Sequence, residues 1–152
     1  MSNDCELVQT GPQPVVKIRT HTPVEGLPQS LGRAFAALEA YLGEIAEPPA
    51  GPPFVAYYNQ DMQNLEIEIG FPVENPGAGR DDVLAGEIPA GRYAACLYTG
   101  PYYGLQSAYQ ALTAWVSEHG YQPSGVSYEY YLNDPEKTAP NDLQTRIVFP
   151  LV

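Results

Sequence analysis

The chain has 152 residues and a formal net charge of -11, because it has 18 Asp and Glu but only seven Lys and Arg. Seven cations cannot make much of a basic surface, which argues against direct nucleic-acid binding, whereas the acidic balance favours a cationic partner. A hydrophobic share of 44% is typical of a folded globular protein, and twelve tyrosines are a heavy aromatic load. The length suits a single domain over residues 1–152, or two small fused halves.

Several classes of function have no signature in the chain. The two cysteines, Cys5 and Cys96, lack the spacing of a metal site and are predicted to be reduced thiols. The sequence contains no Gly-rich phosphate loop, no nucleophile elbow and no His–Cys ligand set. It also has no charged leader with an apolar run and no membrane-length apolar stretch. We therefore expect a cytoplasmic protein with no cofactor and no metal.

The first half of the chain predicts the order strand, strand, helix, strand, strand. Apolar residues at a period of two indicate strands, and apolar residues at three-and-four spacing indicate an amphipathic helix. A Pro-rich loop at residues 47–53 cannot continue that helix. The expected elements are two short strands around a turn at residues 6–8 and 15–19, a helix from Leu27 to Ile45, and strands at residues 54–58 and 65–71.

The same order recurs after a linker at residues 74–82. The expected elements are strands at residues 84–87 and 93–99, a helix from Leu105 to His119, and strands at residues 126–132 and 143–151. Individual positions also match. Pro23, Gly26 and Leu27 recur 78 positions later as Pro101, Gly104 and Leu105, while Tyr57, Tyr58 and Asp61 recur 73 positions later as Tyr130, Tyr131 and Asp134.

These matches indicate an internal repeat, at about residues 5–74 and 83–152. One copy alone would leave a small sheet with an open face, so pairing two copies buries what each exposes. We expect an α+β fold in which two βαββ-like halves, related by a pseudo-twofold axis, form a curved antiparallel sheet with two main helices. The junction between the copies is expected to form a ligand cleft.

The strand at residues 126–132 carries the main site candidate. Large aromatic residues occur on both of its faces, so Glu129 is expected in partly apolar surroundings. A buried carboxylate is unfavourable unless a cation or hydrogen-bond donors meet it. The sequence leaves two possible partners for the Glu129 carboxylate: Arg146 of the last strand, in a structural ion pair, or the positive charge of a ligand. A lipophilic cation could supply that charge while its rings stack on tyrosines.

The other candidates surround this acid. Tyr131 shares the face of Glu129, and its repeat mate Tyr58 would approach from the other half, with Ala56 in place of the acid. Glu66 and Glu68 are read either as a solvated strand face or, for Glu68, as a second acid of the cleft. The predicted ligand-binding residues are Glu129, Tyr131, Tyr58, Tyr98, Tyr102, Tyr103 and Glu68, against the alternative of ordinary packing for each tyrosine.

Four stretches together resemble the GyrI-like family, the effector-binding domain that is also fused to AraC-type and MerR-type multidrug regulators. They are Gly-Glu-Ile-Pro-Ala-Gly-Arg-Tyr-Ala at residues 86–94, Thr-Gly-Pro-Tyr at 99–102, Tyr-Glu-Tyr-Tyr-Leu-Asn-Asp-Pro at 128–135 and Phe-Pro-Leu-Val at 149–152. The resemblance covers nearly the whole chain. It implies two βαββ-like halves around a small-molecule groove and places the family's buried acid on Glu129.

The resemblance implies broad-specificity binding of bulky aromatic, preferably cationic, small molecules. Two alternatives remain open: a hydrolase of cyclopropane-bearing aromatic natural products with Glu129 as acid or base, and a protein-binding module of the gyrase-inhibitor kind. Because the first repeat begins near residue 5, we expect a stand-alone member without direct nucleic-acid or membrane binding. A separate protein partner such as gyrase or a regulator is compatible with this interpretation.

Overall fold

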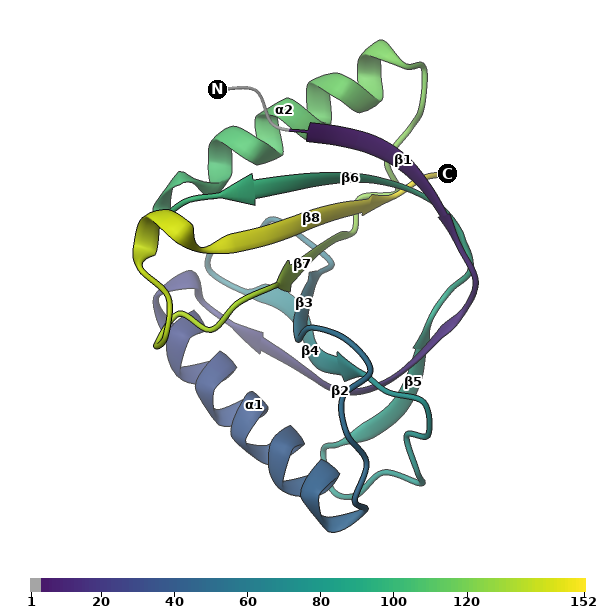
Figure 1. Cartoon of the computed structure of the whole chain (residues 1–152), viewed down its shortest axis with the longest axis vertical. Helices are drawn as coiled ribbons and strands as arrows, with labels where there is room; N and C mark the ends of the chain where they lie inside the picture. The colour runs from purple at the N-terminus through teal and green to yellow at the C-terminus, as the bar shows by residue number, and fades with distance from the viewer. Residues whose placement is uncertain (1–3) are drawn as a thin grey trace. The chain divides into compact units, whose positions relative to one another are not determined.

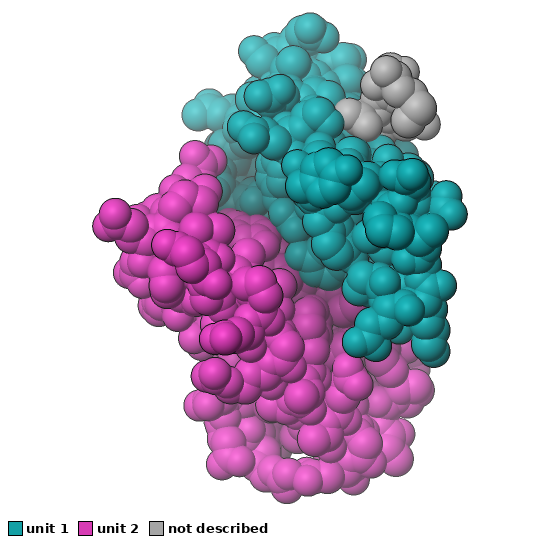
Figure 2. All heavy atoms as spheres, turned by 90° about the vertical axis from the view of Figure 1, so that its left-hand side faces the viewer, with its two compact units in different colours: residues 1–10, 91–152 teal, residues 11–90 magenta. Residues whose placement is uncertain are grey.

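The computed structural model describes residues 4–152, which divide into two compact units. Unit 1 contains residues 4–10 and 91–152, and unit 2 contains residues 11–90 (Figure 2). Each unit has a four-stranded antiparallel sheet and one long helix (Figure 1). The predicted α+β class is therefore confirmed.

Unit 1 places its strands in the order β1-β6-β8-β7. Its elements are β1 (Asp4–Thr10), β6 (Gly91–Thr99), the short 3-10 helix η2 (Tyr102–Gly104), α2 (Leu105–Glu118), β7 (Ser127–Tyr131), the 3-10 helix η3 (Pro140–Asp142) and β8 (Gln144–Pro150). The helix α2 packs on β6. Its apolar residues Ala108, Leu112 and Val116 recur one turn apart and are fully buried against that face of the sheet.

Unit 2 repeats this arrangement with the order β3-β4-β2-β5. Its elements are β2 (Gln13–Thr22), the 3-10 helix η1 (Val24–Gly26), α1 (Leu27–Glu44), β3 (Phe54–Tyr57), β4 (Leu65–Pro72) and β5 (Leu84–Ile88). The helix α1 begins with Pro28 in its first turn, where the missing N–H of proline is harmless, and packs on β2 and β4. No helix of residues 4–152 is both long and apolar enough to cross a membrane.

The compact units do not coincide with the two sequence repeats, because each unit contains one strand that belongs by sequence to the other repeat. Residues 4–10 belong to the first repeat by sequence, yet β1 pairs with β6 of unit 1. Residues 84–88 belong to the second repeat, yet β5 pairs with β2 of unit 2. The neighbouring strands expected around each turn therefore do not pair with each other, and each unit is completed by a strand of the other repeat.

Strand register corrects the predicted match between Tyr58 and Tyr131. Tyr130 lies opposite Arg146 in unit 1, and Ala56 lies opposite Glu68 in unit 2, while Arg146 and Glu68 are themselves 78 positions apart. The residues of β7 therefore correspond to those of β3 at a displacement of 74 positions, not 73. A shift of one residue moves a side chain to the other face. The counterpart of Tyr131 is therefore Tyr57, and Val55 takes the place of Glu129.

Candidate ligand-binding site

Glu129 is a buried carboxylate on the helix-covered face of unit 1. It lies in β7 opposite Ile147 of β8, and Ile147 belongs to the core beneath α2. Only 8% of the residue is exposed. Burial of an ionised carboxylate is unfavourable unless donors or a cation surround it, so the contacts of Glu129 decide its role.

Two tyrosine hydroxyls donate hydrogen bonds to this carboxylate. Tyr109 of α2 donates to Oε2 at 2.5 Å, and Tyr131 of β7 donates to Oε1 at 2.8 Å. Burial raises the pKa of Glu129, and these two hydrogen bonds offset only part of that rise. Each carboxylate oxygen has one neutral donor, while the negative charge itself is not balanced by these contacts.

Within residues 4–152, no Lys, Arg or His side chain lies within ion-pair distance of Glu129. Arg146, the alternative partner considered from the sequence, lies opposite Tyr130 in the strand register. Neighbouring residues of a strand point to opposite faces, so Arg146 shares the face of Tyr130 and not that of Glu129. The ion-pair alternative was wrong.

Aromatic rings adjoin the carboxylate. The ring of Tyr102 packs edge-to-face against that of Tyr131, with 5.8 Å between centroids. Burial, with the negative charges of Asp134 and Glu129, raises the pKa of Tyr102, so its hydroxyl stays protonated. The adjacent Tyr103 is 91% exposed. Unit 1 thus brings together, among the described residues, a buried acid that no cation neutralises and the rings of Tyr102 and Tyr131.

Two further residues share the face of Glu129 and Tyr131. Thr145 lies opposite both Tyr98 and Tyr131, and its buried hydroxyl has no hydrogen-bond partner within residues 4–152. Tyr98 lies in the core beneath α2 and donates its hydroxyl to the carbonyl of Pro101 at 2.7 Å. Of the two, Thr145 offers the unsatisfied polar atom.

Unit 2 contains a second buried glutamate whose charge is balanced. Glu68 is 6% exposed and lies within 3.1 Å of Lys17 Nζ and 2.9 Å of Arg19 Nη1. Tyr58 also donates to it, at 2.8 Å. Burial alone would raise the pKa of Glu68, but these contacts outweigh it and the pKa is lowered. This geometry is that of a structural ion pair, and the solvated-face reading of Glu68 was wrong.

The structure therefore gathers part of the predicted set. Glu129, Tyr131 and Tyr102 lie together in unit 1, whereas Tyr58 and Glu68 bond to each other in unit 2. The sequence analysis missed Tyr109 and Thr145. Tyr109 follows Leu105 by one helical turn, so the three-and-four spacing of the apolar stripe could have included it.

Tyr109→Phe is expected to raise the pKa of Glu129 further, because it removes the donor to Oε2 and leaves burial unchanged. A hydrogen bond to a carboxylate contributes about 1.5–3 kcal/mol, so the further rise of the Glu129 pKa should be large enough to measure. A carboxyl-detected NMR titration of Glu129 measures it. Tyr103→Phe, at an exposed ring, is the control and should leave the titration unchanged.

Comparison with known proteins gives one family. The sequence profile of the GyrI-like small molecule binding domain matches residues 3–152 of the chain. No curated protein sequence is significantly similar to it.

Solved structures share the fold at low sequence identity. The EcmrR chain in the EcmrR–DNA complex aligns with 98% of this chain, and the aligned part is 57% of the EcmrR chain. The sequence identity is 20% and the TM-score is 0.85. The C-terminal domain of EcmrR alone is matched over 99% of its length, with 100% of this chain covered, 21% identity and a TM-score of 0.76. This chain thus spans little more than half of the EcmrR chain in that complex.

Two other structural neighbours are named for different properties, one for a bound ligand and one as a hydrolase. SAV2435 bound to tetraphenylphosphonium is 11% identical, with 98% of this chain and 94% of that chain covered and a TM-score of 0.72. A hydrolase from Listeria innocua is 12% identical, with 99% and 93% covered and a TM-score of 0.73. At these identities the likeness establishes the fold alone.

Proposed function

Since the chain belongs to the GyrI-like small-molecule-binding domain family, we propose that it binds bulky aromatic cations with broad specificity and that Glu129 supplies the counter-charge. The observation that carries this proposal is the buried Glu129 carboxylate, which has two tyrosine donors and no cation within the described residues. A bound ligand with delocalised positive charge would remove the penalty of that burial.

The rings next to Glu129 supply the second part of the affinity. A cation over a tyrosine face gains about 0.5–1 kcal/mol when exposed and about 2 kcal/mol or more when desolvated. Neither the charge nor the ring faces of Tyr102 and Tyr131 demand a particular ligand shape. Such a site therefore favours charge and aromatic area over exact fit, which is what broad specificity needs. The named ligand of SAV2435, tetraphenylphosphonium, is of this kind and supports the choice of probe.

The direct test compares two ligands that differ in charge. We expect isothermal titration calorimetry to give clearly tighter binding for tetraphenylphosphonium than for triphenylphosphine oxide, which keeps the aryl groups but has no net charge. A thermal-shift series should agree, because only ligands that prefer the folded state raise Tm. Equal affinities for the cation and the neutral compound would contradict the proposal.

The affinity for tetraphenylphosphonium should rise with pH. Glu129 must be ionised to attract the cation, and burial raises its pKa above the usual glutamate value of about 4.3. Below the folded-state pKa the affinity should increase up to tenfold per pH unit and then reach a plateau above it. Because the probe has no titrating group, calorimetry between pH 4.5 and 8 reports the protein alone. A flat profile for the wild-type chain would count against Glu129.

A hydrolase is the second candidate, favoured by the raised pKa of Glu129. A carboxyl group that titrates nearer neutral pH can both accept and donate a proton, and a strained ring needs little further machinery. The structural neighbour named as a hydrolase is compatible with this reading. Incubation with a cyclopropane-bearing aromatic natural product should then yield ring-opened product, one water heavier, in excess over protein. Product that never exceeds the amount of protein would exclude turnover.

A further inference from the structure

A cavity of about 400 Å³ lies within unit 2, between α1 and β2. Its floor consists of buried apolar side chains from three segments: Ile18, Ala34, Tyr41 and Val83. An apolar cavity of about 150 Å³ is enough to hold benzene, and small-molecule pockets begin near 300 Å³. The space is thus large enough for a ligand, and its lining residues all belong to unit 2.

The internal repeat explains why this space exists. The residues of β2 and β6 correspond at a displacement of 78, since Ile18 lies opposite Ile69 and Cys96 lies opposite Ile147. The helices α1 and α2 begin at the same displacement. Three lining positions of the cavity therefore have larger apolar or aromatic counterparts in unit 1: Thr20 corresponds to Tyr98, Ala34 to Leu112, and Ala37 to Trp115.

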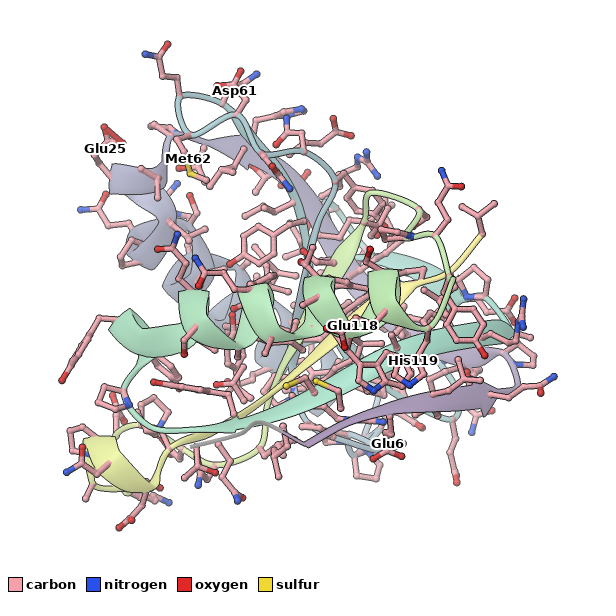
Figure 3. The ribbon with its side chains drawn as sticks, turned by 90° about the horizontal axis from the view of Figure 1, so that it is seen from above. Glu6, Glu25, Asp61, Met62, Glu118 and His119 are labelled. Carbon is pink, nitrogen blue, oxygen red and sulfur yellow. The ribbon has the colours of Figure 1, made fainter. Side chains whose placement is uncertain are left out.

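In unit 1 the counterpart side chains pack in or against the hydrophobic core. Tyr98 and Leu112 are members of the core, and Trp115 packs against it. The indole of Trp115 also stacks on His119, at the end of α2 (Figure 3), with 4.1 Å between ring centroids. Trp115 also stacks on Tyr121. The same architecture thus accommodates a flat bicyclic ring at this position.

Unit 2 compensates only in part for the missing rings. Ile18, Arg33, Tyr41 and Val83 are larger than their counterparts Cys96, Ala111, His119 and Cys5, but none of them stands at the positions of Tyr98 and Trp115, where unit 2 has Thr20 and Ala37. Ala37 is exposed, so the space opens to solvent where the ring of Trp115 would lie. Covering apolar surface that faces water in a concave site is favourable, because it removes that surface from water.

The rim of the cavity indicates an uncharged ligand. Arg33 and Arg80 lie there with Asp81 and Asp82, so the formal charges balance. Arg80 is also paired with Glu44. Arg33 makes no ion pair within residues 4–152, and its guanidinium could lie over a ligand ring.

Guanidinium-over-ring contacts and polar wall groups are both present in the chain. Arg92 lies over Tyr121 at 5.4 Å from its centroid. Ser30 and Thr20 are also lining residues, and a hydroxyl side chain can accept a hydrogen bond from a ring N–H or O–H. A flat ring with one polar hydrogen matches these features.

We infer that this cavity is a second small-molecule site, which takes a flat, uncharged aromatic compound of indole size. The ligand ring occupies in unit 2 the position that the Trp115 ring occupies in unit 1. Its faces lie between the small side chains of α1 and the apolar floor, and its edge meets the polar rim. This site prefers neutral rings, in contrast to the cation preference proposed for the Glu129 site.

Indole is the probe, and Ala37→Trp is the blocking variant. Saturation-transfer NMR and calorimetry should detect indole binding to the wild-type chain, and the methyl resonances of Ala34 and Ala37 should shift. Ala37→Trp puts the ring of unit 1 into unit 2 and should weaken indole binding at least tenfold. Ala36→Trp, at an exposed neighbouring position outside the lining, adds the same side chain and should leave binding unchanged.

The test is independent of the cation site. Glu129→Gln should leave indole binding unchanged, so a failure of the proposed cation binding does not affect this result. Absence of indole binding to the wild-type chain at millimolar concentration would overturn the inference. Unchanged binding in Ala37→Trp, with methyl shifts elsewhere, would also overturn it. Ala34→Leu, which restores the residue of unit 1 on the floor, is the second blocking variant if the tryptophan variant is poorly folded.

Discussion

Replacing Glu129 with Gln is expected to weaken the binding of tetraphenylphosphonium about thirtyfold, while the binding of triphenylphosphine oxide stays the same. Thirtyfold corresponds to about 2 kcal/mol, the size expected for losing one charged partner at a mostly buried site. The Gln side chain keeps the shape of the glutamate and can still accept a hydrogen bond from Tyr109 or Tyr131. The change therefore removes the charge with little disturbance of the packing, and calorimetry at pH 8 measures the charge directly.

Glu118→Gln is the matched control for this variant. Glu118 lies at the end of α2 in the same unit and is exposed (Figure 3). Its removal changes the net charge of the chain by the same amount, so any general attraction of a cation to an acidic protein falls equally in both variants. Long-range attraction is also screened by salt. Equal losses in Glu118→Gln and Glu129→Gln would show that net charge, not the buried carboxylate, governs the affinity.

The secondary structure was largely predictable because periodicity is local. The stripe from Leu27 and the alternation at residues 65–71 gave the correct element types, and α1 and β4 begin at Leu27 and Leu65 as expected. Strand partners are not local. Nothing near residues 4–10 indicates that they pair with residues 91–97 across most of the chain. The sequence pattern therefore could not predict that β1 pairs with a strand of the second repeat and β5 with a strand of the first.

The one-residue error at Tyr58 has a similar origin. Each repeat contains a Tyr-Tyr pair, and aligning the two pairs as identical residues gives a displacement of 73. Pairing in the sheet instead depends on the position at which the preceding loop ends and β3 or β7 begins to pair with its partner strand. The displacement given by the strand registers is 74, one residue more than the displacement given by matching identical residues. Since one residue reverses the face, the match assigned Tyr58 to the wrong counterpart.

The burial of Glu129 was predictable, but its hydrogen-bond donors were only partly so. Alternation with aromatic residues marked it as buried, and this is confirmed. Its donor Tyr109 comes from a helix twenty positions earlier, and that proximity depends on tertiary packing. The ion pair of Glu68 could have been predicted from the sequence. Lys17 and Arg19 alternate on β2 with the same period of two as Glu66 and Glu68 on β4. Complementary charges at period two on adjacent strands predict a paired face.

The two buried glutamates respond to pH in opposite directions. Glu68 has a lowered pKa, so it stabilises the fold above the usual glutamate pKa and loses that contribution as the pH falls. Glu129 has a raised pKa, so its protonated form favours the folded state. That contribution is complete below the usual glutamate pKa and is lost as the pH rises through the higher folded-state value.

Glu68→Gln is therefore expected to destabilise the protein by about 2 kcal/mol at pH 7, because Lys17 and Arg19 lose their charged partner and Tyr58 loses an anionic acceptor. Glu129→Gln should do the reverse and stabilise the protein by on the order of 1 kcal/mol at pH 8, because it removes a buried charge that no cation meets. Urea unfolding at pH 4, 6 and 8 measures both. The effect of Glu68→Gln should shrink toward pH 4, and that of Glu129→Gln should grow toward pH 8. If Glu129→Gln is instead as destabilising as Glu68→Gln at pH 8, the carboxylate of Glu129 is balanced within the fold, and a binding site for a ligand's charge is no longer required to explain it.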